Sequence, residues 1–246
     1  MAQPIPGPLL YEEGRSSSGA REFFGNMPLD LPINPDSVCF MDDFTMLHGK
    51  ALNQTDMYDV VKDSSASIAM TDAHGGVVVL TSAATTDNDG VLLQCTTQLV
   101  KLQSNKKLWF EARYQTSDAD DSDNFVGLAK QAATNPEAVV VAGLARIGFQ
   151  INEGDASILF VSDNGTVTTS TDTGIDASDA TDVVLGFHYN GSKIDVYVNR
   201  MKVLSGLTPT VVVGTDLLSP ACFHLSGNAT GTHTGKLDYL MMVAER

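Results

Sequence analysis

Paired carboxylates are the first candidates for chemistry in this sequence. Two carboxylates at alternate positions of one strand share a face of the sheet, where one can act as nucleophile and the other as acid on a glycosidic bond. The pattern Glu-x-Asp-x-x-Glu places two carboxylates on one face of a strand in this way, and the chain does not contain this pattern. The nearest stretch, Glu153-Gly154-Asp155, continues into ASILF without a second Glu. The sequence therefore predicts that the protein is not a glycoside hydrolase and not an enzyme, with no catalytic residues.

An acidic turn, Asp118-Ala-Asp-Asp-Ser-Asp123, offers clustered oxygen ligands of the kind that calcium prefers. It lacks the central Gly of an EF-hand loop, and Ala129 stands where that loop has its bidentate Glu. Acidic turn residues are mostly solvated, so no cofactor and no metal are predicted, with a structural calcium ion kept as the alternative. The five histidines show no spacing that favours zinc, and no Gly-x-Ser-x-Gly motif supplies a serine nucleophile.

Charge excludes several classes of partner. The chain has 246 residues, 30 acidic against 15 basic side chains, and a formal net charge of −15. This charge repels nucleic acid and anionic lipid, so neither a nucleic-acid nor a membrane partner is expected. Three cysteines at wide spacing predict free thiols rather than a disulfide framework.

Residues 1–37 differ from the rest of the chain. They hold most of the nine prolines and follow neither a helical nor a strand period. Their apolar side chains nevertheless need a pocket, which predicts an extended N-terminal arm that binds a partner surface. The alternatives are an arm packed over its own domain and a free tail. The predicted anchors of this arm are Leu9, Leu10, Tyr11, Phe23 and Phe24.

Residues 38–246 alternate apolar and polar residues in about a dozen short runs that are separated by Asp, Asn and Gly. In KIDVYVNRMKVLSG, residues 193–206, two such runs flank Asn199-Arg200, which predicts a hairpin. In KLWFEARY, residues 107–114, Phe110, Ala112 and Tyr114 share one face, and Trp109, Glu111 and Arg113 share the other. The pattern predicts an all-β fold with two packed antiparallel sheets.

The order of these runs resembles the concanavalin A-like or laminin-G-like jelly roll of bacteriophage structural proteins. The resemblance rests on MDDF (41–44), GGVVVLTSA, KLWFEARYQTSDADDSDNFVGLA, IGFQIN, VLGFHYNGSKIDVYVNRMKVLSG and the closing GKLDYLMMVAER, and covers residues 38–246. The family hairpin usually carries Asn-Gly where this chain has Asn199-Arg200. The resemblance implies a two-sheet β-sandwich and a role in the virion.

The function predicted from this resemblance is that of a capsid decoration protein. Its expected partner is the major capsid protein, its expected location the outer capsid surface of the virion, and its expected assembly a homo-oligomer, taken as a trimer. The alternative is a lectin-like module that binds host surface glycan. Because an exposed aromatic ring beside Asp and Asn can hold a sugar, the residues predicted for that alternative are Trp109, Asp120, Asp123 and Asn124.

Overall fold

The computed structural model describes residues 36–44, 57–63, 65–71, 76–82, 87–131, 136, 143–211, 213–227 and 231–246. The N-terminal arm and its five predicted anchors lie outside these residues, so the arm stays a prediction. Among the described residues there is no helix with the length and apolarity needed to span a lipid bilayer.

The described part of the chain folds into fifteen strands. Their bounds are β1 Ser37–Asp42, β2 Tyr58–Lys62, β3 Ser67–Thr71, β4 Val77–Thr81, β5 Gly90–Cys95, β6 Leu108–Thr116, β7 Ser122–Ala129, β8 Ala145–Asn152, β9 Asp155–Asn164, β10 Thr168–Asp176, β11 Val183–Tyr189, β12 Ile194–Val198, β13 Met201–Leu207, β14 Ser219–Ser226 and β15 Thr234–Glu245.

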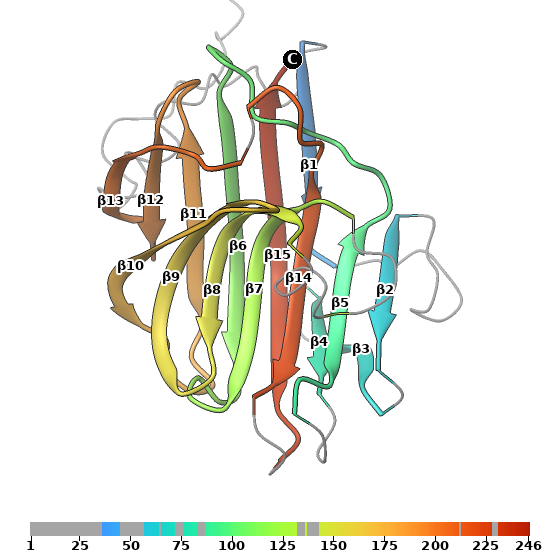
Figure 1. Ribbon diagram of the computed structural model, residues 1–246. Coiled ribbons are helices and arrows are strands. Elements are labelled where there is room, and N and C mark those ends of the chain that lie inside the picture. Colours follow the sequence, from blue (N-terminus) through green and yellow to red (C-terminus); the bar gives the residue numbers. More distant parts are fainter. Residues whose placement is uncertain are drawn as a thin grey trace, which may run out of the picture.

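The strands form two antiparallel sheets that stack face to face (Figure 1). Sheet A has the order β13-β12-β11-β6-β15-β4-β3, with β1 also paired to β15. Sheet B has the order β10-β9-β8-β7-β14-β5-β2. The predicted all-β, two-sheet sandwich is confirmed.

The core lies between the sheets and is built by the alternation of each strand. Strand β6 buries Phe110, Ala112 and Tyr114 in the main apolar cluster, as its sequence pattern predicts. Phe110 stacks on Phe187 of β11, which meets Phe160 of β9 edge to face across the sandwich. Burial of such rings contributes about 1.5–3 kcal/mol each, so the core holds the sheets at a fixed spacing.

The predicted hairpin is present. Strands β12 and β13 pair through Val198 and Met201, with Asn199 and Arg200 as the two turn residues. The three cysteines are free thiols, with Cys95 and Cys222 buried and Cys39 exposed.

Candidate functional site

The outer face of sheet A carries a polar cluster at its centre. Because residues alternate along β6, Glu111 and Arg113 point away from the core that Phe110 and Ala112 fill. Antiparallel pairing brings Arg113 opposite Val184 of β11 and Tyr239 of β15. Register therefore assembles side chains from distant parts of the sequence on one surface.

Glu111 anchors this cluster. Its side chain is only 2% exposed, and it accepts hydrogen bonds from the Tyr239 hydroxyl at 2.7 Å and from two Arg200 nitrogens at 3.1 and 3.3 Å. The bond to Glu111 raises the pKa of Arg200, and burial followed by the Glu111 charge raises the pKa of the Tyr239 phenol. Arg200 therefore stays charged and Tyr239 stays protonated, so both remain hydrogen-bond donors at neutral pH.

Arg200 reaches Glu111 from an unusual backbone position. Asn199 and Arg200 have φ angles of 51° and 63°, the left-handed region in which Gly is favoured at the second turn position. Asn199 steadies the turn by accepting the Val184 backbone N–H with its side-chain oxygen at 3.0 Å. The arginine at position 200, where the family hairpin usually carries glycine, was therefore the sequence signal for the contact between Arg200 and Glu111. The sequence did not identify Glu111 as the partner of this arginine.

Arg113 holds two further carboxylates on the same face. It donates from one guanidinium nitrogen to Asp238 at 2.9 Å and from another to Asp182. Asp182 precedes β11, and Asp238 sits where the pairing of β15 with β6 shifts register between Leu237 and Tyr239. This bulge leaves Asp238 among the outward-facing groups, because an extra residue re-aims the side chains around it.

Two adjoining hollows share Arg113, and together we call them the charged trough. The first, about 280 Å³, is lined by Arg113, Val184, Asn199, Arg200 and Tyr239. The second, about 320 Å³, is lined by Thr71, Val77, Arg113, Gln115, Asp182, Lys236 and Asp238. Three cations (Arg113, Arg200, Lys236) face three carboxylates (Asp182, Asp238 and the underlying Glu111), so the formal charges of the trough balance.

The trough corrects one inference from the sequence. The missing Glu-x-Asp-x-x-Glu pattern was taken to mean that no two carboxylates share a face. Asp182 and Asp238 nevertheless line one hollow and flank one guanidinium. The inference failed because it considered one strand at a time, whereas Asp182 lies just before β11 and Asp238 lies in β15, the two strands that flank β6.

The residues predicted for glycan contact do not come together. Trp109 is completely buried and stacks on the ring of His188, with 4.9 Å between centroids, so the expected exposed indole is wrong. Asp120, Asp123 and Asn124 follow the opposite end of β6. Asp120 is exposed and Asp123 half-buried, while Asn124 is buried and its side-chain oxygen contacts the His224 ring at 2.6 Å.

Two residues of the acidic turn and one histidine could together hold a metal. One ligand atom each from Asp118, Asp121 and His233 lies within 4.8 Å of the others. Burial, together with the nearby Asp87 charge, raises the pKa values of Asp123 and Glu153. Neither of these two carboxyls belongs to the group of three, in which the two aspartates offer the oxygen ligands that calcium prefers and His233 offers a nitrogen. The prediction of no metal, with calcium at this turn as its alternative, stays untested.

The comparisons with known proteins agree on the fold. Neither a protein-family model nor a curated protein matches the chain. A Shewanella oneidensis protein of unknown function has a TM-score of 0.60 at 14% identity, over 94% of this chain and 95% of that one. An endo-1,3-β-glucanase from Streptomyces sioyaensis has a TM-score of 0.58 at 12% identity, over 86% and 98%. A Bacillus licheniformis β-glucanase has 0.56 at 11%, over 83% and 97%. The fold is a concanavalin A-like jelly roll.

These comparisons contradict two predictions from the sequence. The neighbours with named activities are glycoside hydrolases, glucanases and a lyase, and nothing among them points to a bacteriophage or a capsid. The prediction of a capsid decoration protein is therefore wrong, and so is the prediction that the protein is not an enzyme. The resemblance identified the jelly roll correctly, but a fold that hosts many functions could not supply the role.

Proposed function

We propose that the protein binds an uncharged glycan in the charged trough. The observation that carries the proposal is the alternation of fixed donors and acceptors along it, with Arg113 held between Asp182 and Asp238 beside Arg200 and Asn199. Each sugar hydroxyl donates one hydrogen bond and accepts others, so vicinal hydroxyls fit a surface on which guanidinium and carboxylate groups stand side by side. The named activities of the structural neighbours support the same class of ligand.

The charge balance favours a neutral ligand over an anionic one. A carboxylate or phosphate entering the trough would compete with Asp182 and Asp238 for Arg113, and the net charge of −15 repels it at long range. Val77, Val184 and Tyr239 supply apolar surface for the C–H faces of sugar rings. The trough therefore matches a sugar chain with polar edges and apolar faces.

A glycan panel tests the proposal. The full chain is titrated with β-1,3- and β-1,4-linked gluco-oligosaccharides and with an oligoglucuronate, and affinities are measured by calorimetry. We expect at least one neutral ligand to bind, and Asp182→Asn to weaken it about tenfold, because the loss of a charged acceptor costs about 1.4 kcal/mol or more. Asp172→Asn, an exposed change on β10, is the matched control and should leave affinity unchanged. Binding unaffected by Asp182→Asn would contradict the assignment.

Cleavage of the bound glycan is the second candidate. It is favoured by Asp182 and Asp238 in one hollow, since two carboxylates flanking a glycosidic bond can act as acid and as nucleophile or base. The assay is the release of reducing ends from each glycan that binds. We expect Asp182→Asn and Asp238→Asn each to lower turnover by about 100-fold or more, well beyond their effect on affinity. Turnover that survives the double variant would exclude this pair.

A further inference from the structure

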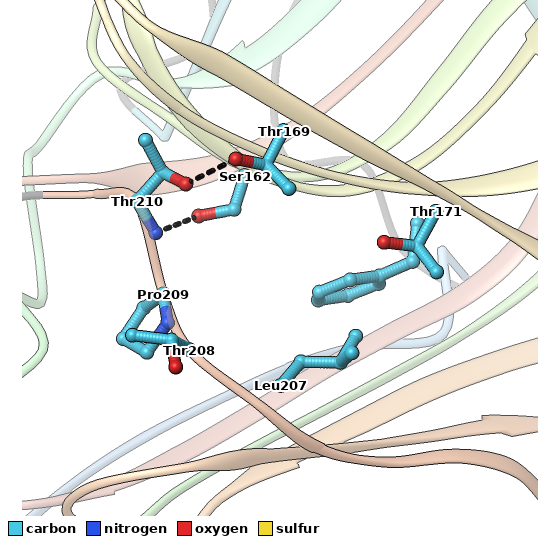
Figure 2. A pocket seen from close by; sticks show the side chains of 8 residues that line it. Ser162, Thr169, Thr171, Leu207, Thr208, Pro209 and Thr210 are labelled. Atoms are coloured by element: carbon cyan, nitrogen blue, oxygen red, sulfur yellow. Dashed lines mark hydrogen bonds between the residues drawn. The ribbon is translucent and has the colours of Figure 1, made fainter.

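A third hollow, which we call the edge pocket, lies between the edges of the two sheets and away from the charged trough. Figure 2 shows its walls: Phe160 and Ser162 come from β9, Thr169 and Thr171 from β10, and residues 207–210 from the end of β13 and the segment after it. Strand β10 ends sheet B and β13 ends sheet A, so the hollow occupies the gap between two edge strands. None of its eight lining residues lines the trough.

The wall opposite β10 is held in place by hydrogen bonds. The Ser162 hydroxyl oxygen accepts the backbone N–H groups of Thr210 at 2.7 Å and Val211 at 3.1 Å. The hydroxyls of Thr169 and Thr210 lie 2.7 Å apart and join β10 to this wall (Figure 2). Lys193 donates to the Thr208 hydroxyl at 2.6 Å from the outside. The hollow is thus formed before any ligand arrives, which lowers the entropic cost of binding.

The lining defines the chemistry of the ligand. No charged side chain is among the eight residues, in a chain with a net charge of −15. Leu207 and the small exposed edge of the otherwise buried Phe160 provide an apolar surface, and Thr171 lines the same hollow (Figure 2). The volume of about 310 Å³ is at the lower end of the range for small-molecule pockets. These properties select a small, uncharged molecule with one apolar side and several hydroxyls.

We propose that this edge pocket binds a single neutral sugar residue with an apolar edge, of the 6-deoxyhexose class. The methyl group of such a sugar packs on Leu207 and on the exposed edge of Phe160, while its ring hydroxyls bond to Thr171 and Thr208. A charged sugar would bury its carboxylate against eight uncharged lining residues, with Lys193 as a cation only behind the Thr208 hydroxyl, which is unfavourable. The proposal does not rest on glycan binding in the trough, because the two sites share no residue.

Titration of the full chain with free monosaccharides tests the proposal. The probes are L-rhamnose, L-fucose, D-glucose and D-glucuronate, and binding is followed by amide chemical shifts of β9 and β10. We expect a deoxy sugar to bind about tenfold more tightly than glucose, which carries a hydroxymethyl group in place of the methyl group, and glucuronate to be weaker still. Equal binding of all four sugars, or binding of none, overturns the proposal.

Variants on β10 separate this site from the trough. Thr171→Val keeps the shape of the side chain and removes its hydroxyl, so affinity for the deoxy sugar should fall about fivefold or more. Thr171→Phe fills the hollow and should abolish binding. Ser170→Ala removes a hydroxyl from the neighbouring exposed position that does not line the hollow, and should bind as the native chain does. Asp182→Asn should leave this binding unchanged, whereas unaltered affinity in Thr171→Phe contradicts the site.

Discussion

At the scale of single residues, the side chain of Arg200 makes hydrogen bonds that offset the cost of its left-handed backbone conformation. A non-glycine residue in the left-handed region costs about 1–2 kcal/mol. Two hydrogen bonds to the buried Glu111 carboxylate offset that cost, because charged hydrogen bonds contribute about 1.5–3 kcal/mol each. These hydrogen bonds hold Arg200 beside Arg113, where both side chains line the same hollow of the trough.

Arg200→Gly tests this balance. The glycine relieves the turn but leaves the Tyr239 hydroxyl as the side-chain donor to Glu111 among the described residues. We therefore expect a net loss of about 1–2 kcal/mol in the free energy of unfolding, allowing for the partial exposure of Arg200. Glu111→Gln combined with Arg200→Gly should recover part of that loss, since no buried charge remains. Urea unfolding of the four proteins gives the coupling energy. An Arg200→Gly protein more stable than the native chain would show that the turn dominates.

The sequence correctly predicted which face of the sheet each residue of β6 occupies, but it did not predict the hydrogen-bond partners of those residues. Alternation placed Glu111 and Arg113 on the outer face of β6 and Ala112 in the core, because a strand has a period of two. The partners Arg200 and Asp238 lie more than eighty residues away along the chain. Which of them meets β6 depends on strand order and on the bulge in β15, and neither is encoded by local pattern.

At the scale of elements, strands β6, β7 and β14 share a buried polar network between the sheets. The Tyr114 hydroxyl contacts Asn124 and the His224 ring, and all three side chains are buried. Burial lowers the pKa of His224 to about 3, so the ring is neutral in the folded protein at neutral pH. The sequence predicted Asn124 as a glycan contact, because a polar residue at the start of a buried strand resembles the end of the preceding loop.

Acid should therefore destabilise the fold through His224. Between pH 6.5 and 3 the unfolded chain binds a proton at this histidine and the folded chain does not, so stability falls as pH drops. We expect this histidine to contribute about 1.4 kcal/mol per pH unit to the slope. His224→Gln should remove that contribution when urea unfolding is measured at several pH values across this window.

Comparing the native chain with His224→Gln isolates the contribution of His224 to the pH dependence of stability. This comparison is needed because Asp123 and Glu153 change the stability in the opposite direction as pH falls. Their pKa values are raised in the folded protein, so protonating them as pH falls stabilises it. An identical slope in the native chain and His224→Gln would show that the buried histidine does not govern acid stability.

At the scale of the whole molecule, the fold was predictable and the site was not. A dozen alternating runs separated by Asn, Asp and Gly permit few arrangements other than two stacked sheets, and the sandwich is confirmed. The function depends on which outward side chains gather after the sheets form. In this chain a net charge of −15 coexists with a trough in which three cations balance three carboxylates.

The formal charge balance of the trough, in an otherwise acidic chain, predicts how the affinity for a glycan depends on salt concentration. A neutral glycan releases no counterions, so its affinity should change less than about twofold between roughly 0.05 and 0.5 M sodium chloride. Calorimetric titrations at several salt concentrations, with the same ligand and pH, provide the measurement. A steep loss of affinity with salt would indicate an anionic ligand and contradict the charge-balance argument.

The most direct test of glycan binding in the trough is to follow the arginine side chains during titration. Nitrogen-15 spectra resolve the Nε–H signals of individual arginines, and Arg146, buried on sheet B, serves as the internal reference. We predict that a bound neutral oligosaccharide shifts the Arg113 and Arg200 signals to saturation with one affinity and leaves Arg146 in place. Binding that moves neither Arg113 nor Arg200 would contradict the account.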